Sequence, residues 1–527
     1  MSVMYLSIEE AVSFINENFQ RDVTTSNVTY LIKYGQIQKH TEKGKTVISI
    51  SDLENYYRKI NETENKWKSK IGNELNWELS FDSIKEYERT KHVHRLHPYK
   101  GKFIPQLVEY FLNDKLNGIK KEVYFKPGDI VIDPFCGSGT TLVQANELGI
   151  HAVGIDISEF NALMSNIKVG HHNLVDLQEA VLIITQSFKI QFSEFIWNDF
   201  DGELISLIAN FNKEYFPTPE ILYRIKNHEI DLPAYSKEKE LELKELYQNL
   251  LKKYKLNVIE SNSNNSFINR WFTPPVKQQL IFILDQINKT KDIEIRRTLL
   301  LILSRTARSC RATTHSDLAT IIDPVLEPYY CYKHNKMCKP LFSLLYWWEF
   351  YSKDTIKRLH QFSTIRTETD QICLTGDSKS IDIEDELIRA NPTFGNKLSI
   401  EKAKGIFTSP PYVGLIDYHE QHAYAYELFN LVRRDDDEIG PQSKGKNTLA
   451  RDKYVQDIAA VLVNTSKFLV EDCEIFIVAN DNYGLYPRIA ETSNLKIVEE
   501  FKRPVLNRTE KDKSAYSEKI FRMKRKA

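Results

Sequence analysis

The sequence predicts an α/β protein: a doubly wound, Rossmann-like sheet with a largely helical insertion, preceded by an N-terminal winged helix-turn-helix. Three observations support this prediction. A buried strand runs through a glycine-rich turn into a helix near residue 135, short strands return only after residue 370, and the first sixty residues follow the order helix, turn, helix, hairpin, helix. The chain has 527 residues, too many for one ordinary core, so several domains are expected.

Residues 1–60 are predicted to form the small N-terminal module. The stretch LSIEEAVSFINENF has apolar residues at helical spacing, and VTYLIKYG follows as a second short helix. Two short strands surround a glycine turn in QIQKHTEKGKTVISI, and SDLENYYRKI forms a third helix. This order resembles excisionase-type DNA-binding modules. A helical dimerisation or docking domain is the alternative, because a fold does not fix a function.

The rest of the chain divides into four segments. Residues 61–92 are polar and predict a linker with some helix. Residues 93–175 contain GDIVIDPFCGSGTTLVQANELGIHAVGIDIS, which is typical of one βα unit with the next strand attached. Residues 176–369 have little strand character and several helical stretches, whereas short strands return in residues 370–527. We therefore expect one α/β core, made of the second and fourth segments, with the helical segment inserted.

The glycine loop after the first core strand predicts a ligand site. The strand ends at Asp133, and Gly137 and Gly139 turn directly into a helix that Thr140 begins. Glycines let the backbone approach a ligand at the strand ends. The next strand ends in Asp156, where an acid is placed to accept hydrogen bonds from ribose hydroxyls. The loop lacks the Gly-Lys-Ser/Thr ending of a P-loop, so the pattern favours a nucleoside over a pyrophosphate.

A second unusual corner lies at residues 409–412, where an apolar strand meets Ser409-Pro410-Pro411-Tyr412. Proline cannot donate to a sheet ladder, so the strand must end at the serine. Two prolines make a stiff corner with exposed carbonyl groups, and the tyrosine adds a flat ring. This combination indicates a site more strongly than an ordinary strand end does.

These motifs resemble those of the S-adenosylmethionine-dependent amino-DNA methyltransferases. DPFCGSGTT with GIDIS looks like motif I and its partner, TSPPY looks like the catalytic motif IV, and residues 97–103 (HPYKGKF) resemble motif X. LTGDS is similar to the strand whose acid lies near the cofactor's adenine. The resemblance spans about 93–170 and 370–527, and it implies a class I methyltransferase core. It implies these cofactor-binding residues: Phe103, Asp133, Phe135, Gly137, Gly139, Thr140, Asp156 and Asp377.

The catalytic motif has a physical interpretation. An exocyclic amine on an aromatic ring is a poor nucleophile because its lone pair is delocalised. The side-chain oxygen of Ser409 and the carbonyl of Pro410 could accept hydrogen bonds from that amine and direct its lone pair at the methyl group, with Pro411 keeping the corner rigid. Tyr412 could stack on a base rotated out of the duplex. No covalent intermediate is needed, so Cys136 in the cofactor loop is not assigned as a nucleophile.

The family resemblance also addresses the target base. A serine at the first position of the motif resembles the N4-cytosine enzymes, whereas aspartate or asparagine is commoner in N6-adenine enzymes. Ser409 therefore favours N4 of cytosine in duplex DNA. N6 of adenine is the alternative, because both acceptor sets can bind either amine.

The order of motifs resembles enzymes in which target recognition is inserted between the cofactor and catalytic halves. Residues 176–369 are therefore expected to recognise the target, assisted by the N-terminal module. The resemblance implies the modification half of a restriction–modification system. Because no nuclease motif is evident, it also implies a separate restriction endonuclease as partner. The alternatives are a DNA-binding regulator with an inactive methyltransferase core and a methyltransferase acting on RNA or protein.

Composition fits a soluble globular protein, with 42% hydrophobic and 27% charged residues and a net charge of −1. The N-terminus lacks the features of a signal peptide, and no apolar run is long enough for a membrane span. Six cysteines in so long a chain predict reduced thiols and a cytoplasmic protein. Cys331, His334 and Cys338, with Cys310 upstream, have ligand chemistry but irregular spacing, so no metal is predicted.

Overall fold

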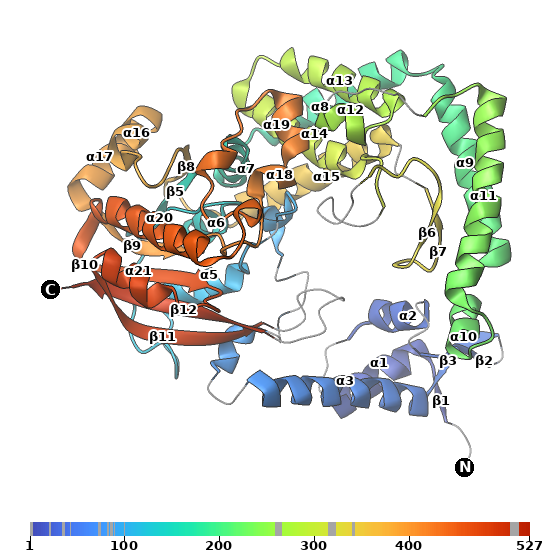
Figure 1. The fold of residues 1–527 in the computed structure, drawn as a ribbon, viewed down its shortest axis with the longest axis horizontal. Helices are drawn as coiled ribbons and strands as arrows, with labels where there is room; N and C mark the ends of the chain where they lie inside the picture. Colours follow the sequence, from blue (N-terminus) through green and yellow to red (C-terminus); the bar gives the residue numbers. More distant parts are fainter. Residues whose placement is uncertain are drawn as a thin grey trace.

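A mixed seven-stranded sheet forms the core of one side of the molecule, at the left in Figure 1. The computed structural model describes residues 4–19, 23–33, 37–42, 44–71, 75–81, 84, 88, 90–99, 101–258, 266–314, 323–339, 343–505 and 516–526. The strands follow the spatial order β11-β12-β10-β9-β4-β5-β8. Their bounds are β4 (Ile130–Asp133), β5 (His151–Asp156), β8 (Gln371–Thr375), β9 (Ala403–Thr408), β10 (Leu469–Ala479), β11 (Leu495–Val505) and β12 (Tyr516–Arg525).

Six strands of this sheet run in the same direction, and β12 runs antiparallel to them between β10 and β11. β9 pairs with β4, so the strand before the Pro-Pro corner lies beside the strand before the glycine loop. β5 pairs with β8 in the register Ala152↔Gln371, although residues 157–370 lie between the two strands. The predicted α/β core, built from two distant parts of the chain, is therefore confirmed.

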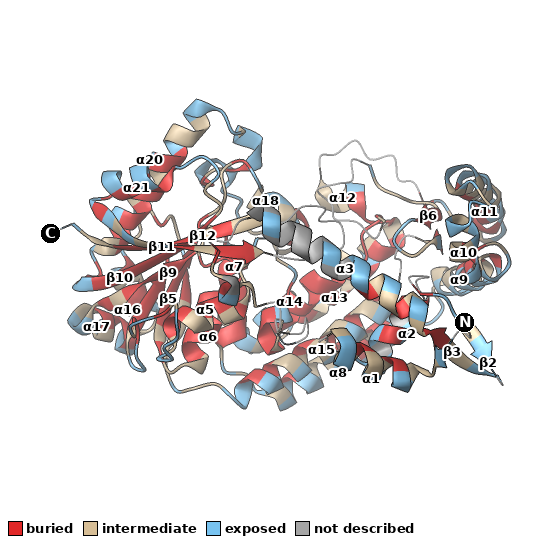
Figure 2. Cartoon of the chain, turned by 90° about the horizontal axis from the view of Figure 1, so that it is seen from below, coloured by how far each residue is buried: buried red, intermediate tan, exposed pale blue. Residues whose placement is uncertain are grey.

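Helices cover both faces of the sheet, as the strand sequences require. Val131 packs in one apolar cluster with α5 (Pro105–Leu112), α6 (Thr140–Glu147) and α7 (Glu159–Val169). Its neighbours Ile130 and Ile132 pack in the other cluster. That second face is covered by α16 (Ile383–Ala390), α17 (Pro392–Glu401), α20 (Thr448–Ser466) and α21 (Tyr486–Thr492). Because successive side chains of a strand point to opposite faces, both faces are apolar, and Figure 2 shows the central strands as buried.

The region between α7 and β8 is largely helical, as predicted. Its helices are α8 (Leu174–Gln191), α9 (Ile196–Tyr215), α10 (Glu220–Lys226), α11 (Leu232–Tyr254), α12 (Phe267–Trp271), α13 (Pro274–Asn288), α14 (Ile293–Ser309) and α15 (Leu344–Ser363). One hairpin interrupts them, β6 (Tyr329–Cys331) with β7 (Lys336–Cys338). Its strands have three residues each, too few to produce an alternating pattern in the sequence. None of the helices in the described ranges is long and apolar enough to cross a membrane.

The N-terminal module has the predicted order of elements. It contains β1 (Tyr5–Leu6), α1 (Ile8–Phe19), α2 (Thr25–Lys33), β2 (His40–Glu42), β3 (Lys45–Ser49) and α3 (Ile50–Ile71). The three strands form their own sheet in the order β1-β3-β2. Ala11, Ile15, Val28, Ile48 and Leu53 form a separate small core. The assignment of this module as a winged helix-turn-helix stays a prediction.

Helix α3 is longer than the sequence suggested. It continues to Ile71, so the predicted boundary at residue 60 falls inside a helix. Residues 61–92 are predicted to form a linker with some helix, and α3 occupies the first part of that segment. Its glutamate and lysine residues are good helix formers, and polarity indicates exposure to solvent rather than the end of a helix.

The N-terminal module contacts the molecule at the far end of the helical region. The backbone amide of Lys39 donates to the Tyr223 hydroxyl of α10 at 2.7 Å. After α3, Asn76 forms paired hydrogen bonds with the backbone of Lys502 in β11, both of 2.8 Å. Sheet, helical region, N-terminal module and α3 therefore follow one another in a ring, which Figure 1 shows from one side.

Candidate active site

A cavity of about 860 Å³, including its open mouth, lies at the carboxyl ends of the central strands. This is the edge of an open α/β sheet where ligands bind. Eight of the predicted site residues line it: Phe103, Phe135, Gly137, Thr140, Asp156, Asp377, Ser409 and Pro411. Four others do not line it: Asp133, Gly139, Pro410 and Tyr412. The structure thus brings most of the predicted cofactor residues together with the serine of the Pro-Pro corner.

Steric crowding explains the two glycines of the loop. Gly137 has φ of 51°, and a Cβ there would lie 2.9 Å from the Tyr99 hydroxyl oxygen. Gly139 has φ of 73°, and its Cβ would lie 2.9 Å from the Cβ of Ser165 in α7. Both positions therefore exclude other residues for conformational and steric reasons. The loop stays close to its neighbours, and its backbone forms a wall of the cavity.

Asp156 is buried at the end of β5 and organises the glycine loop. Its Oδ2 accepts a hydrogen bond from the Gly137 amide at 2.7 Å. Its Oδ1 accepts from the Ser158 amide at 2.8 Å and from the Asn161 side chain at 3.1 Å. Burial raises the pKa of this carboxyl, and the three donors oppose that shift. Since a carboxylate has about four acceptor positions, Asp156 keeps capacity for a ligand hydroxyl.

Asp133 has a different place from the one expected. It is buried at the end of β4, and its Oδ1 accepts from the Thr408 hydroxyl at 2.6 Å and from the Phe135 amide at 3.2 Å. Burial raises the pKa of Asp133 to about 6, partly opposed by hydrogen bonds from threonine side chains. The contact to Thr408 joins the strand of the glycine loop to the strand of the catalytic corner. Asp133 therefore supports both loops from below the cavity wall.

The remaining predicted cofactor residues lie on the cavity wall. Phe103 packs its ring edge-on to Phe407, with centroids 5.7 Å apart. Asp377 follows β8, and its Oδ1 accepts from the Lys379 amide at 3.0 Å. The neighbouring Ser378 donates to the Pro134 carbonyl at 2.7 Å, which fixes this loop against the glycine loop. The ends of β4, β5 and β8 thus each contribute residues to the cavity wall.

The Pro-Pro corner is held rigidly by the rest of the core. β9 ends at Thr408, as the prolines require, and Ser409 is half-buried at the cavity. The Pro411 carbonyl accepts from the Tyr454 hydroxyl at 2.9 Å. Within the described ranges, no residue donates a hydrogen bond to the Pro410 carbonyl. One carbonyl of the corner is thus used to hold it, while the adjacent one is available to a substrate.

Tyr412 does not line the cavity. Its hydroxyl donates to Glu518 in β12 at 3.1 Å, and Glu518 also pairs with Arg503 in β11 at 2.7 Å. The side chain is half-buried. Its role as a stacking partner for a base stays a prediction.

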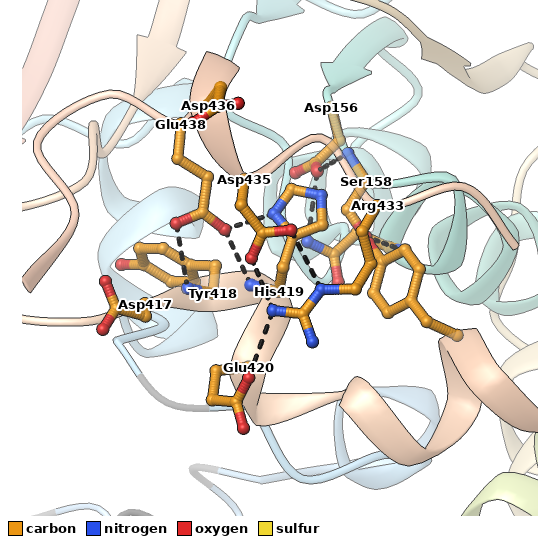
Figure 3. A network of polar contacts seen from close by, with 12 residues as sticks. Asp156, Ser158, Asp417, Tyr418, His419, Glu420, Arg433, Asp435, Asp436 and Glu438 are labelled. Carbon is orange, nitrogen blue, oxygen red and sulfur yellow. Dashed lines mark hydrogen bonds and ion pairs between the residues drawn. The ribbon is translucent and has the colours of Figure 1, made fainter. Parts of the chain in front are cut away.

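The segment after the corner completes the cavity with residues outside the predicted site. Tyr418 and His419 belong to α18 (Tyr418–Gln421), and both line the cavity with Glu438. Glu438 accepts from the backbone amide of His419 at 2.7 Å and also contacts the His419 ring (Figure 3). Tyr99 stacks on Tyr418 with centroids 5.9 Å apart. No local signal in the sequence pairs His419 with Glu438, which lies 19 positions away.

Motif X lies against the same segment. The His97 ring contacts the Pro98 carbonyl at 2.9 Å through Nδ1 and the Tyr424 hydroxyl at 3.3 Å through Nε2. Tyr424 belongs to α19 (Ala423–Phe429) and is fully buried. Lys102 donates to the His94 carbonyl at 2.8 Å, and Lys100 lies outside the described residues. This histidine thus packs in the core, whereas Tyr99 and Phe103 reach the cavity.

The fold and the cavity define an α/β enzyme that binds a nucleoside-type cofactor beside a rigid corner of hydrogen-bond acceptors. Comparisons with known proteins are more specific. The family model described as DNA methylase, N6_N4_Mtase, matches residues 15–166. The Type II methyltransferase M.MjaII of Methanocaldococcus jannaschii is 45% identical over 524 residues, which are 98% of this chain and 96% of that protein.

Two further relatives match over short segments. The Type II methyltransferase M.EcaI of Enterobacter cloacae is 33% identical over 105 residues, covering 19% of this chain and 23% of that protein. A tRNA (guanine(10)-N2)-dimethyltransferase of Methanocaldococcus jannaschii is 33% identical over 93 residues, covering 18% of this chain and 24% of that protein. The match to M.MjaII covers 98% of this chain and therefore includes the helical region as well as the core.

The chain belongs to the amino-DNA methyltransferases of restriction–modification type. Enzymes of this family take the methyl group from S-adenosyl-L-methionine. The cavity fits this cofactor, because the buried Asp156 retains acceptor capacity at the strand end and the glycine loop leaves no room for a Cβ at Gly137.

Proposed function

We propose that this protein methylates the exocyclic N4 of cytosine at a specific sequence in duplex DNA. The observation that carries the proposal is the acceptor pair at the corner. Ser409 lies at the cavity, and the Pro410 carbonyl receives no hydrogen bond from the described residues. The choice of cytosine comes from the serine, by resemblance to the N4-cytosine enzymes. N6 of adenine is the alternative target, because the same two acceptors can bind either amine.

The proposed reaction is a direct transfer. S-adenosyl-L-methionine supplies an electrophilic methyl group when it is bound. Ser409 and the Pro410 carbonyl accept hydrogen bonds from the amine, so that the nitrogen lone pair points at the methyl carbon. The nitrogen–carbon bond forms as the carbon–sulfur bond breaks, and the amine then releases one proton to water. Because Tyr454 already fixes the Pro411 carbonyl, these acceptors need little reorganisation.

The cofactor is assigned to the wall formed by three strand ends. Asp156 would accept a ribose hydroxyl, and Asp377 would lie at the adenine side of the cavity, with Phe103 and Phe135 as apolar contacts. Asp133 and Gly139 would act indirectly, through Thr408 and through the close approach to Ser165. Residues 137–140 would thus shape the loop, and Asp156 would bind the cofactor.

Target recognition is assigned to residues 176–369, assisted by the N-terminal module. The target base must leave the duplex to reach the cavity, because within the duplex its amine is base-paired and its ring is stacked between neighbouring bases. Tyr412 is proposed to stack on the target base, with its hydroxyl bonded to Glu518. A separate restriction endonuclease would cleave the same sequence when it is unmethylated.

The proposal is tested by expressing the protein in cells without DNA methylation and analysing nucleosides of their DNA by mass spectrometry. We expect N4-methylcytosine, and we expect it to be absent with Ser409→Ala. N6-methyladenine instead would keep the enzyme class and refute the assignment of the base. If neither base appears, a DNA-binding regulator with an inactive core becomes the better description.

A further inference from the structure

The β6–β7 hairpin carries two cysteines and a histidine that converge on one point. Cys331 ends β6, His334 lies in the connecting turn, and Cys338 ends β7. The turn is closed by a hydrogen bond from the His334 amide to the Cys331 carbonyl at 3.0 Å, and Asn335 has φ of 50°. The histidine is thereby folded back over the strands that hold the cysteines.

The strand register places both cysteines on the same side of the hairpin. Tyr329 pairs with Cys338, and Cys331 pairs with Lys336. Cys331 lies two residues beyond Tyr329, so it shares a face with the partner of Tyr329. Both cysteines are buried in a small cluster with Tyr329, while Tyr330 and Met337 pack from the other face into the main core.

We propose that Cys331, His334 and Cys338 bind one zinc ion. The Nδ1 atom of His334 lies 3.5 Å from the Cys331 sulfur and 3.7 Å from the Cys338 sulfur, and all three donor atoms lie within 4.8 Å of one another. Zinc–sulfur bonds of about 2.3 Å and zinc–nitrogen bonds of about 2.0 Å at tetrahedral angles separate sulfur from nitrogen by about 3.5 Å. The observed spacing therefore matches the edges of a zinc tetrahedron.

Hydrogen bonding explains the convergence of the three side chains less well than a bound metal ion does. One ring nitrogen has either one hydrogen or one lone pair, so Nδ1 can form a normal hydrogen bond with only one of the two sulfurs at a time. A metal ion uses all three donors at once. Two thiolates neutralise the charge of Zn²⁺.

The ligand set is soft and suited to zinc. Within the described ranges no fourth side chain of ligand type joins the three, so we assign the fourth position to water. Cys310, which precedes the hairpin in the sequence, is not part of the group, because its sulfur faces the Ser343 carbonyl at 4.0 Å. His334 is half-buried, which gives an ion access from solvent.

A second group of ligand-type side chains does not support the same inference. His92 and His94 in η2 (His92–Arg95) approach Glu147, with 3.0 Å between His92 Nε2 and the carboxylate. The Lys91 ammonium lies 2.5 Å from the other oxygen of that carboxylate. An ion pair thus already satisfies Glu147, and the hairpin remains the better metal site.

Zinc would fix the shape of a hairpin that is otherwise short. The hairpin is anchored through Asn212 of α9, which forms two hydrogen bonds with the Met337 backbone of 2.8 and 2.9 Å. The Tyr330 amide donates to Glu240 of α11 at 3.0 Å. At the tip of the hairpin, the Tyr332 side chain is 67% exposed. The ion would hold this tip at a constant position relative to α9 and α11.

The test measures zinc in the full-length protein, purified from zinc-supplemented cells without chelators. We expect one zinc ion per chain by elemental analysis. Cys331→Ala and Cys338→Ala should each remove it, whereas Cys310→Ala, at an equally buried cysteine outside the group, should keep it. A wild-type protein without zinc, or retention of zinc in both hairpin variants, would overturn the proposal.

Two further measurements separate metal binding from folding. His334→Cys should keep the ion because cysteine is also a zinc ligand, whereas His334→Ala should weaken binding at least about tenfold. Circular dichroism checks that each variant is folded. Titration of the metal-free wild-type protein with cobalt(II) should produce thiolate-to-metal absorption, and a lack of that absorption would contradict the two-thiolate site even if every variant failed to fold.

Discussion

The glycine loop and the Pro-Pro corner lie at the ends of neighbouring strands, yet they use their polar atoms in opposite ways. Asp133 and Asp156 receive hydrogen bonds from their own chain, two and three respectively. At the corner, the Pro410 carbonyl receives none from the described residues, and Ser409 opens to the cavity. The first region is stabilised by its internal bonds. The second is available for an external partner.

This difference indicates where binding and catalysis should separate. Groups already satisfied in the free protein shape a site, whereas groups with unused hydrogen-bonding capacity interact with what enters it. Changes at the corner should therefore affect turnover, and changes at the two acids should affect cofactor binding or stability. Four predictions test this division.

The largest effect is expected from Ser409→Ala. Removing one acceptor of the amine should lower kcat by about 100- to 1000-fold. Cofactor Kd should change by less than about twofold, because Asp156 and the glycine loop are untouched. Steady-state kinetics on duplex DNA and calorimetry with the cofactor provide the two values. Ser378→Ala, at another serine of the cavity wall, is the matched control, and an equal loss of cofactor binding in Ser409→Ala would contradict the division.

The next largest effect is the pH dependence of the stability that Asp133 contributes. The pKa of Asp133 is raised to about 6 in the folded protein, above its unfolded value near 3.8. Between these values the folded state binds more protons, so the contribution of Asp133 to stability is present below about pH 4 and is lost as pH rises through 6. The loss amounts to about 3 kcal/mol at most.

Asp133→Asn removes this titration while keeping the acceptor oxygen for Thr408 and Phe135. The Tm of the variant should therefore rise relative to that of the wild type as the pH increases from 4 to 7. Thermal unfolding across this range measures the difference. A constant difference would show that Asp133 does not titrate in this range.

A smaller effect is expected from Asp156→Ala. Loss of the carboxylate should raise cofactor Kd by about 10- to 100-fold, since both the loop amide and the ligand lose an acceptor. Turnover at saturating cofactor should remain within a few-fold of wild type. Asp377→Ala should follow the same pattern more weakly, because that acid is less buried. A variant that lost kcat and kept Kd would reverse the assignment.

The smallest effect is expected from Tyr454→Phe. The change removes the hydrogen bond to the Pro411 carbonyl without removing the ring. At about 1 kcal/mol for such a bond, turnover should fall by about fivefold, with cofactor Kd unchanged. Kinetics with saturating DNA test it, and unaltered turnover would show that the prolines alone keep the corner rigid.

The sequence predicted those parts of the site whose signals are local. The glycine loop and the corner were found because glycine and proline restrict the backbone wherever they occur. The bond between Thr408 and Asp133 could not be predicted, because it joins residues 275 positions apart. The place of Glu438 at the cavity could not be predicted either, because it depends on the contacts of Glu438 with the His419 backbone and ring.

The fold shows the same limit. Strands after residue 370 were expected, but the antiparallel place of β12 between β10 and β11 depends on long-range pairing. The extension of α3 to Ile71 was missed because polarity indicates exposure and not the end of a helix. The zinc ligands were visible as residue types, and only the register of β6 and β7 brings them onto one face.

The pairing of β5 with β8 has a consequence for how such enzymes diversify. The whole helical region leaves the sheet after one strand and returns at its immediate neighbour. Helix α7 carries the chain back along the sheet before this region begins, and the Arg366 side chain donates to the Gly170 carbonyl at 2.7 Å, so the two junctions lie close together. The entropic cost of closing a longer connection grows only logarithmically. Over evolutionary time, one contiguous piece of gene can therefore be lengthened, shortened or exchanged while the reaction chemistry is inherited unchanged.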